Sequence, residues 1–173
     1  MFDKFGEFDS AEELNRAAEE YLKQESEEGM AAVLAIAEEN GIDKEDALDY
    51  INHVVDEFVT PRMAALGKLN LEHKEYEISG ILYDWEVEVR GLCVSDEKVC
   101  AAVRKKGKSL RDCMATLIAF AFENKVQVSD KITKVTKVKH NGKLEPVNTP
   151  LYLGVPNKTE AKKIIIEYYL KEN

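Results

Sequence analysis

Residues 10–125 repeat one pattern, in which a helix-capping residue precedes apolar residues at helical spacing. Ser10, with Glu13 three positions later, has the form of a capping box, and Thr60 precedes a proline at the first helical position. After each cap, apolar residues recur every three or four positions, as on the buried face of an amphipathic helix. The other expected caps are Ser26, Asp43, Asp96 and Ser109. This pattern predicts a succession of helices over the first two-thirds of the chain.

Two further helices are predicted from the same spacing. One runs from about residue 75 to residue 93, and Ser79-Gly80 is its weakest point because glycine disfavours a helix interior. The other closes the chain and begins at a cap on Asn157 or Thr159.

The sequence changes character between these helices. Residues beyond 125 are rich in β-branched side chains, and the stretch HNGK at 140–143 contains the strongest short signal for a β-hairpin. Two antiparallel strands are predicted at about residues 131–139 and 143–153. Within the first of these, apolar residues recur every three positions, which favours a helix beginning at Ser129, so both structures stay open there. The predicted fold class is α+β, mainly helical, with a short hairpin near 131–153 and a C-terminal helix.

Length and composition indicate a globular protein. A chain of 173 residues with 45% hydrophobic and 33% charged residues can bury a core as one domain. We predict a single domain over residues 1–173, in which an acidic helical subdomain (1–70) precedes a helical unit with a basic hairpin (71–173). No membrane span or signal peptide is expected, which points to the cytoplasm.

Enzyme and metal-site signatures are missing from the sequence. It contains no phosphate-binding loop, dinucleotide fingerprint, nucleophile elbow or HExxH motif. The three cysteines, Cys93, Cys100 and Cys113, have no C-x-x-C spacing and are expected to be buried reduced thiols. We therefore expect no catalytic residues, no metal and no cofactor, and we interpret the chain as a binding protein.

Charge is segregated along the chain. Residues 1–100 carry 26 Asp/Glu against 9 Lys/Arg, a net charge of −17, while residues 101–173 carry 7 against 15, a net charge of +8. Such asymmetry indicates a nucleic-acid or protein partner that recognises charge, because the electrostatic field of a whole protein steers its association with a charged partner. The alternative, that the two ends neutralise each other within one domain, stays open.

Two basic clusters are candidates for contacts with nucleic acid or with a partner. One loop carries five cations beside a helix N-terminus at Ser109, where charge and free backbone amides could hold phosphates. The other lies in the predicted hairpin. Each has a plain alternative, as a solvated loop or as edge-strand lysines that prevent aggregation. The candidate residues are Arg104, Lys105, Lys106, Lys108 and Arg111 in the loop, and Lys134, Lys137, Lys139 and Lys143 in the hairpin.

The acidic helices supply a second kind of candidate surface. Rows of carboxylates can imitate DNA phosphates and occupy a basic channel of a nucleic-acid enzyme. The acidic partner-binding candidates are Glu19, Glu20, Glu27 and Glu28. The alternative is an ordinary solvated helix face.

Three stretches of the chain resemble small proteins encoded on mobile elements of gut Clostridia. They are FDKFGEFDSAEE (2–13), AEENGIDKEDA (37–47) and AVRKKGKSL (102–110). Among those proteins, the chain resembles an anti-CRISPR family that inhibits type II Cas nucleases. The resemblance implies a non-enzymatic inhibitor that binds the nuclease–guide RNA complex and blocks target DNA binding or cleavage.

A second resemblance covers only the C-terminal third. KSLRDC (108–113), Leu117-Ile118 and Glu167-Tyr168-Tyr169 resemble PcfK-like accessory proteins of conjugative elements. That resemblance implies a nucleic-acid-binding accessory protein that acts on free DNA. Under either interpretation DNA or RNA contact is expected, and the sequence leaves open whether the protein forms a homodimer.

Overall fold

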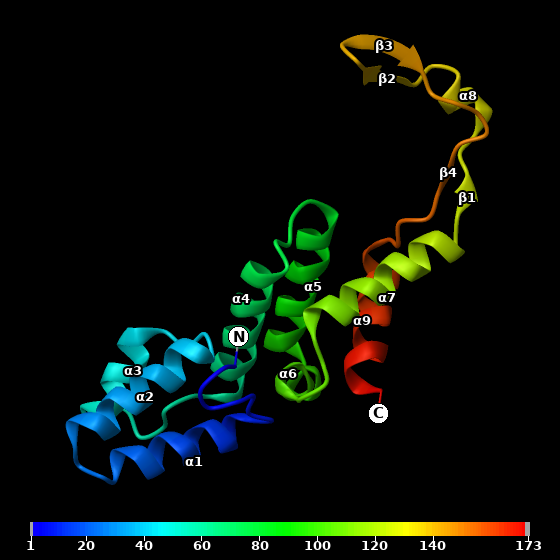
Figure 1. Ribbon diagram of the computed structural model, residues 1–173. Helices are drawn as coiled ribbons and strands as arrows, with labels where there is room; N and C mark the ends of the chain where they lie inside the picture. Colours follow the sequence, from blue (N-terminus) through cyan, green and yellow to red (C-terminus); the bar gives the residue numbers. More distant parts are fainter. Residues whose placement is uncertain (1, 172–173) are drawn as a thin grey trace.

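The computed structural model describes residues 2–171, and helices make up most of it. Helices form the body, and one long arm leaves it (Figure 1). The helices before the arm are α1 (Ala11–Leu22), α2 (Glu27–Glu39), α3 (Lys44–Ile51), α4 (Pro61–Glu75), α5 (Ile81–Ser95), α6 (Glu97–Arg104) and α7 (Leu110–Glu123). The predicted helical first two-thirds is confirmed.

The arm holds the strands and one helical turn. Its elements are β1 (Val126–Gln127), α8 (Asp130–Thr133), β2 (Lys137–His140), β3 (Lys143–Pro146) and β4 (Tyr152–Leu153), and α9 (Lys158–Leu170) follows. Antiparallel pairing joins β1 to β4 and β2 to β3. We call residues 125–156 the basic arm. The predicted α+β class, mainly helical with a short hairpin and a C-terminal helix, is confirmed.

The predicted N-caps are confirmed by their hydrogen bonds. Ser10 Oγ accepts a bond of 3.2 Å from the Glu13 N–H, and Asn157 forms a complete capping box with Glu160. Each cap satisfies a backbone N–H that has no partner within its helix. The same role falls to Ser26, Asp43, Thr60, Asp96 and Ser109.

The prediction that a helix begins at about residue 75 is wrong. α4 continues to Glu75, and α5 begins only at Ile81. Glu77 and Gly80 between them have φ angles of 49° and 58°, in the left-handed region that ends a helix. The break lets Ile78 turn into the core, where it is 7% exposed.

Residues 129–139 combine the two structures that their sequence allows. Ser129 Oγ accepts a hydrogen bond of 3.3 Å from the Lys131 N–H and caps the single turn α8, after which β2 runs in extended form. Asn141 and Gly142 then have φ angles of 47° and 80°. Positive φ at both central residues is the mark of a type I′ turn, which suits the twist of a tight hairpin.

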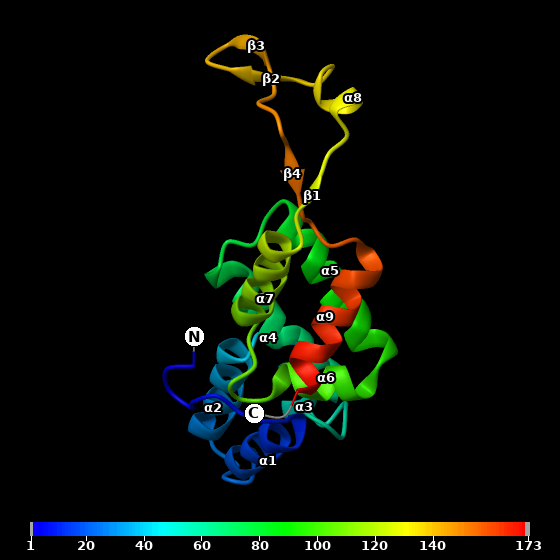
Figure 2. The same cartoon turned by 90° about the vertical axis from the view of Figure 1, so that its right-hand side faces the viewer.

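Buried side chains form two clusters that meet within α4. The first gathers residues of α1, α2, α3 and the segment before α4, among them Leu14, Ile36 and Phe58. The second gathers residues of α4, α5, α6, α7 and α9. Ala64 belongs to the first cluster and Ala65 to the second, so α4 contributes buried residues to both clusters. Figure 2 shows α9 returning from the arm to lie along the second group of helices.

The end of α2 touches α4 backbone to backbone. A Cβ on Gly67 would overlap the carbonyl oxygen of Asn40, and a Cβ on Gly41 would overlap the carbonyl oxygen of Gly67. Gly41 also has a φ of 68°, where a side chain is strained. The two glycines therefore set how closely the N-terminal helices sit on α4.

Among residues 2–171, every helix is too short or too polar to cross a bilayer.

Candidate nucleic-acid and partner interface

The basic arm projects from the body as an antiparallel ribbon. It leaves the C-terminal end of α7, turns at the β2–β3 hairpin and returns to the start of α9, and both views show it clear of the helices (Figures 1 and 2). The pairing of Val126 with Leu153 and of Gln127 with Tyr152 closes its base. A segment held only at its base can reach a partner that the body does not touch.

Charge on the basic arm is almost entirely positive. It carries six lysines against Asp130 and Glu145, and all six lysine side chains are exposed. No ion pair among the described residues joins an arm lysine to a carboxylate, so their charge is available to a ligand. The predicted candidates Lys134, Lys137, Lys139 and Lys143 all belong to this set.

The strand register divides these lysines between two faces. Lys139 pairs with Leu144 across the hairpin, and His140 pairs with Lys143. Side chains alternate along a strand and cross-strand partners share a face, so Lys137 and Lys139 lie on one face with Leu144, and Lys143 lies on the other. Residues two apart on a strand are about 7 Å apart, roughly twice the axial rise per phosphate along one DNA strand. The first face therefore suits a phosphate backbone.

Large apolar side chains of the arm are also exposed. Val135 is 77% exposed and Leu144 is 70% exposed, and Ile132 and Val138 are exposed as well. None of the residues of the arm belongs to either buried cluster of the described chain. These side chains are therefore accessible on the arm.

Two of the five cations that the sequence predicts for binding around the loop between α6 and α7 are buried. Arg104 and Lys108 are 1% and 7% exposed, so neither can meet a nucleic acid at the surface. Lys108 Nζ donates to the carbonyl oxygens of Tyr168 and Lys171 at the end of α9, at 3.0 and 2.7 Å. A cation there offsets the negative end of the helix dipole and satisfies carbonyls that lack helical partners.

Arg104 is held between the two groups of helices. Its guanidinium donates to Asn40 Oδ1 and lies 5.5 Å from the ring centre of Phe2. Its Nε and Nη1 atoms are buried without a hydrogen-bond partner. Of the five predicted loop cations, the exposed ones are Lys105, Lys106 and Arg111. The last of these lies 2.8 Å from the Asp112 carboxylate, which neutralises it.

A buried lysine explains why the loop is held so tightly. Lys68 of α4 is 1% exposed, and its Nζ donates to Glu7 Oε1 at 2.6 Å. It also donates to the carbonyl oxygens of Lys105 and Lys108, at 3.0 and 2.7 Å. The N–H of Lys106 donates in turn to Asp9. The sequence reasoning missed this role, because nothing in the pattern around Lys68 distinguishes it from a surface lysine of α4.

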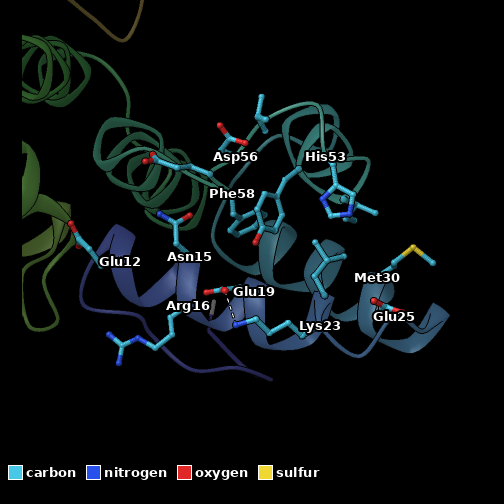
Figure 3. A pocket seen from close by; sticks show the side chains of 15 residues that line it. Glu12, Asn15, Arg16, Glu19, Lys23, Glu25, Met30, His53, Asp56 and Phe58 are labelled. Carbon is cyan, nitrogen blue, oxygen red and sulfur yellow. Dashed lines mark ion pairs between the residues drawn. The ribbon is translucent and has the colours of Figure 1, made fainter.

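An acidic hollow lies in the N-terminal group of helices. It is an open groove of about 870 Å³ beside α1, bounded by the segment that joins α3 to α4 (Figure 3). Among its lining residues are Glu12, Glu19, Glu25, Met30, Val55, Asp56, Glu57 and Phe58. We call this hollow the acidic groove.

Only one of the four acidic candidates lines the acidic groove. Glu19 does, and its Oε1 lies 2.6 Å from Lys23 Nζ, as the dashed line in Figure 3 shows. Glu20, Glu27 and Glu28 are exposed outside the groove. The last two occupy the first turn of α2, where carboxylates favour the helix dipole.

The sequence reasoning missed the carboxylates Asp56 and Glu57 of the groove. They lie in the irregular segment after α3, which has no helical spacing to place them on a face. Phe58 beside them is 1% exposed and packs on Tyr50 with ring centres 5.5 Å apart. The buried ring anchors the segment, so the two carboxylates stay exposed at the rim of the groove.

Several buried titratable side chains of the described residues contact one another away from the arm and the groove. The thiols of Cys93 and Cys100 are buried, and their mutual interaction raises the pKa of Cys93 and lowers that of Cys100. Glu86 is fully buried between His73 and Arg90 in a structural ion network. Among residues 2–171, no three His, Cys, Asp or Glu side chains gather as a metal site requires.

Comparisons with known proteins do not indicate a function for this chain. No family model, no curated protein and no solved structure matches the chain.

Proposed function

We propose that this protein acts by binding, and that the basic arm contacts the phosphate backbone of a nucleic acid. The observation that supports it is the projecting ribbon with six exposed lysines, none of which forms an ion pair with a carboxylate of residues 2–171. A two-stranded ribbon fits the major groove of B-DNA, and lysines act on phosphates through charge alone. Such binding is strongly salt-dependent and largely independent of base sequence.

We further propose that this nucleic acid is presented by a type II CRISPR Cas nuclease loaded with guide RNA, and that binding inhibits the nuclease. The support is the resemblance of residues 2–13, 37–47 and 102–110 to an anti-CRISPR family, together with the charge distribution. A Cas nuclease combines a positively charged channel with exposed RNA and DNA backbones. An acidic helical body suits the first, and the basic arm suits the second.

The experiment compares three ligands: a short duplex DNA, the guide RNA alone, and the nuclease loaded with guide RNA. Binding is followed by gel filtration and fluorescence anisotropy between about 50 mM and about 200 mM salt, and cleavage of target DNA is assayed in parallel. If the four candidate lysines of the arm each meet one phosphate, log K falls against log salt with a slope of about −3.6. The arm variant Lys134→Glu, Lys137→Glu, Lys139→Glu, Lys143→Glu should lose binding and flatten that slope.

A matched variant controls for the change in net charge. Lys74→Glu, Lys98→Glu, Lys162→Glu and Lys163→Glu reverse four exposed lysines of the helical body. This variant should bind and inhibit as the unaltered protein does. Binding to free duplex DNA without binding to the loaded nuclease would favour the accessory protein of a conjugative element. Failure to bind any of the three ligands would overturn the proposal.

A further inference from the structure

The basic arm and the acidic groove have opposite charge and lie at opposite ends of one molecule. The arm leaves the body beyond α7, whereas the groove lies beside α1 and α3 (Figures 1 and 2). The helical body separates them in both views, so an arm cannot fold back into the groove of its own chain. We propose that the protein self-associates by docking the basic arm of one copy into the acidic groove of a second copy.

The groove carries the negative charge that such docking needs. Five carboxylates line it, against Arg16 and Lys23. Lys23 is already paired with Glu19, and Glu25, Asp56 and Glu57 have no ion-pair partner among the described residues. These three carboxylates are exposed at the rim. Unpaired carboxylates around a hollow attract a cationic segment, and this attraction weakens with salt.

The apolar parts of the two surfaces also match. Met30 and Val55 line the groove and are 40% and 42% exposed. On the arm, Leu144 is the cross-strand partner of Lys139 and shares one face of the hairpin with Lys139 and Lys137. The face of the arm that carries Leu144 and two lysines would then meet a groove lined by exposed apolar side chains and carboxylates. Burying these side chains would supply the hydrophobic part of the contact.

The positions of the two surfaces define the symmetry of the assembly. Two copies placed side by side and antiparallel bring each arm toward the groove of the other. The result is a closed twofold dimer with two identical contacts. Because the arm lysines are the same ones that we propose for nucleic-acid contact, dimer formation and nucleic-acid binding would compete.

The test is the oligomeric state of the full chain without any nucleic acid. Sedimentation velocity and light scattering at low salt should show a concentration-dependent dimer, and raising the salt should dissociate it. Lys134→Glu, Lys137→Glu, Lys139→Glu reverses the arm, and Glu25→Lys, Asp56→Lys, Glu57→Lys reverses the groove. Each variant alone should dimerise at least about tenfold more weakly, since like charges then face each other.

Mixing the two variants makes the test specific. In the mixed dimer, the reversed arm meets the reversed groove, and the unaltered arm meets the unaltered groove. Both contacts are again attractive, so the mixture should form a heterodimer at concentrations where each variant alone dimerises at least about tenfold more weakly than the unaltered protein. Circular dichroism checks that both variants are folded, and Lys98→Glu, Lys162→Glu, Lys163→Glu serves as the control for net charge and should still dimerise.

Three results would overturn the proposal. The unaltered protein could stay monomeric at every concentration at low salt, the arm variant could dimerise as well as the unaltered protein, or the mixture could fail to associate. Because no nucleic acid or nuclease is present, these outcomes are independent of the proposed function. A protein that dimerises but binds no nucleic acid would support this inference and contradict the other.

Discussion

Glu72 Oε2 accepts a hydrogen bond of 2.9 Å from the backbone N–H of Leu110, the first residue of α7. The carboxyl group belongs to α4, is 1% exposed and lies one turn beyond Lys68. It thus fastens the start of α7 to the helix that both buried clusters share. Burial raises the pKa of Glu72 from its usual 4.5 to about 7, although the Leu110 N–H and Lys68 both favour the charged form.

The raised pKa makes stability depend on pH. The folded state holds the Glu72 proton more tightly than the unfolded state, so folding is favoured below the unfolded pKa of 4.5. The free energy of unfolding should fall as pH rises from 4.5 to about 7, by on the order of 3 kcal/mol from this group. Denaturant titrations of Glu72→Gln across this range should lack that fall. Glu75→Gln, exposed on the same helix, should retain it, and parallel profiles for all three proteins would contradict the assignment.

Removing the Lys68 ammonium should be among the most destabilising single changes. Lys68→Met leaves Glu7 without its ion-pair partner and leaves two loop carbonyl oxygens without this donor. Breaking one side of a buried ion pair costs about 3–5 kcal/mol. Urea unfolding measures the loss, and Lys74→Met at an exposed site of α4 should change stability by less than about 0.5 kcal/mol. Equal effects of the two substitutions would show that Lys68 does not hold the loop.

Two glycines within helices should respond oppositely to alanine. Gly67→Ala places a methyl group against the carbonyl oxygen of Asn40 and should destabilise the protein by about 1–3 kcal/mol, because the backbones must move apart. Gly91→Ala in α5 meets no atom within 4 Å. It should stabilise the protein by about 0.5–1 kcal/mol, since alanine favours a helix interior. Thermal unfolding of both variants tests the pair, and similar melting temperatures would argue against the close approach of α2 and α4.

The basic arm should be removable without loss of the body. Gln127 and Tyr152 are cross-strand partners, so an Asn-Gly turn in place of residues 128–151 can close the ribbon at its base. The shortened protein should keep its helical circular dichroism, and its free energy of unfolding should change by less than about 1 kcal/mol, because the arm supplies no residue to the buried clusters. It should lose both nucleic-acid binding and self-association. Unfolding of the shortened protein would mean that the arm is part of the core.

Much of the fold could be predicted because it depends on neighbours in sequence. A cap such as Ser10 acts on the N–H of Glu13 three residues away, and the Asn141-Gly142 turn acts on the strands directly beside it. The boundary between α4 and α5 failed for the opposite reason. Ser79-Gly80 was the local signal, and α5 does begin directly after Gly80, but Ile78 packs in a cluster most of whose members are distant in sequence.

The candidate binding residues differ in the same way in how well the sequence predicts them. The lysines of the hairpin were predicted as exposed, and they are, because a projecting ribbon has no neighbours to bury them. Arg104 and Lys108 belong to an equally basic stretch, yet they are buried by α9, by Asn40 and by the N-terminal segment, which are distant in sequence. Charge density alone does not distinguish the two cases.

Helix positions, capping, the hairpin turn and the segregation of charge all follow from the order of residues, since each rests on interactions within a few positions or on composition. The burial of Lys68, Glu72 and Arg104, the contact of Gly41 with Gly67 and the shape of the acidic groove were decided only when distant segments packed together. Desolvation depends on everything that surrounds a group, and a linear sequence does not show which segments will surround it.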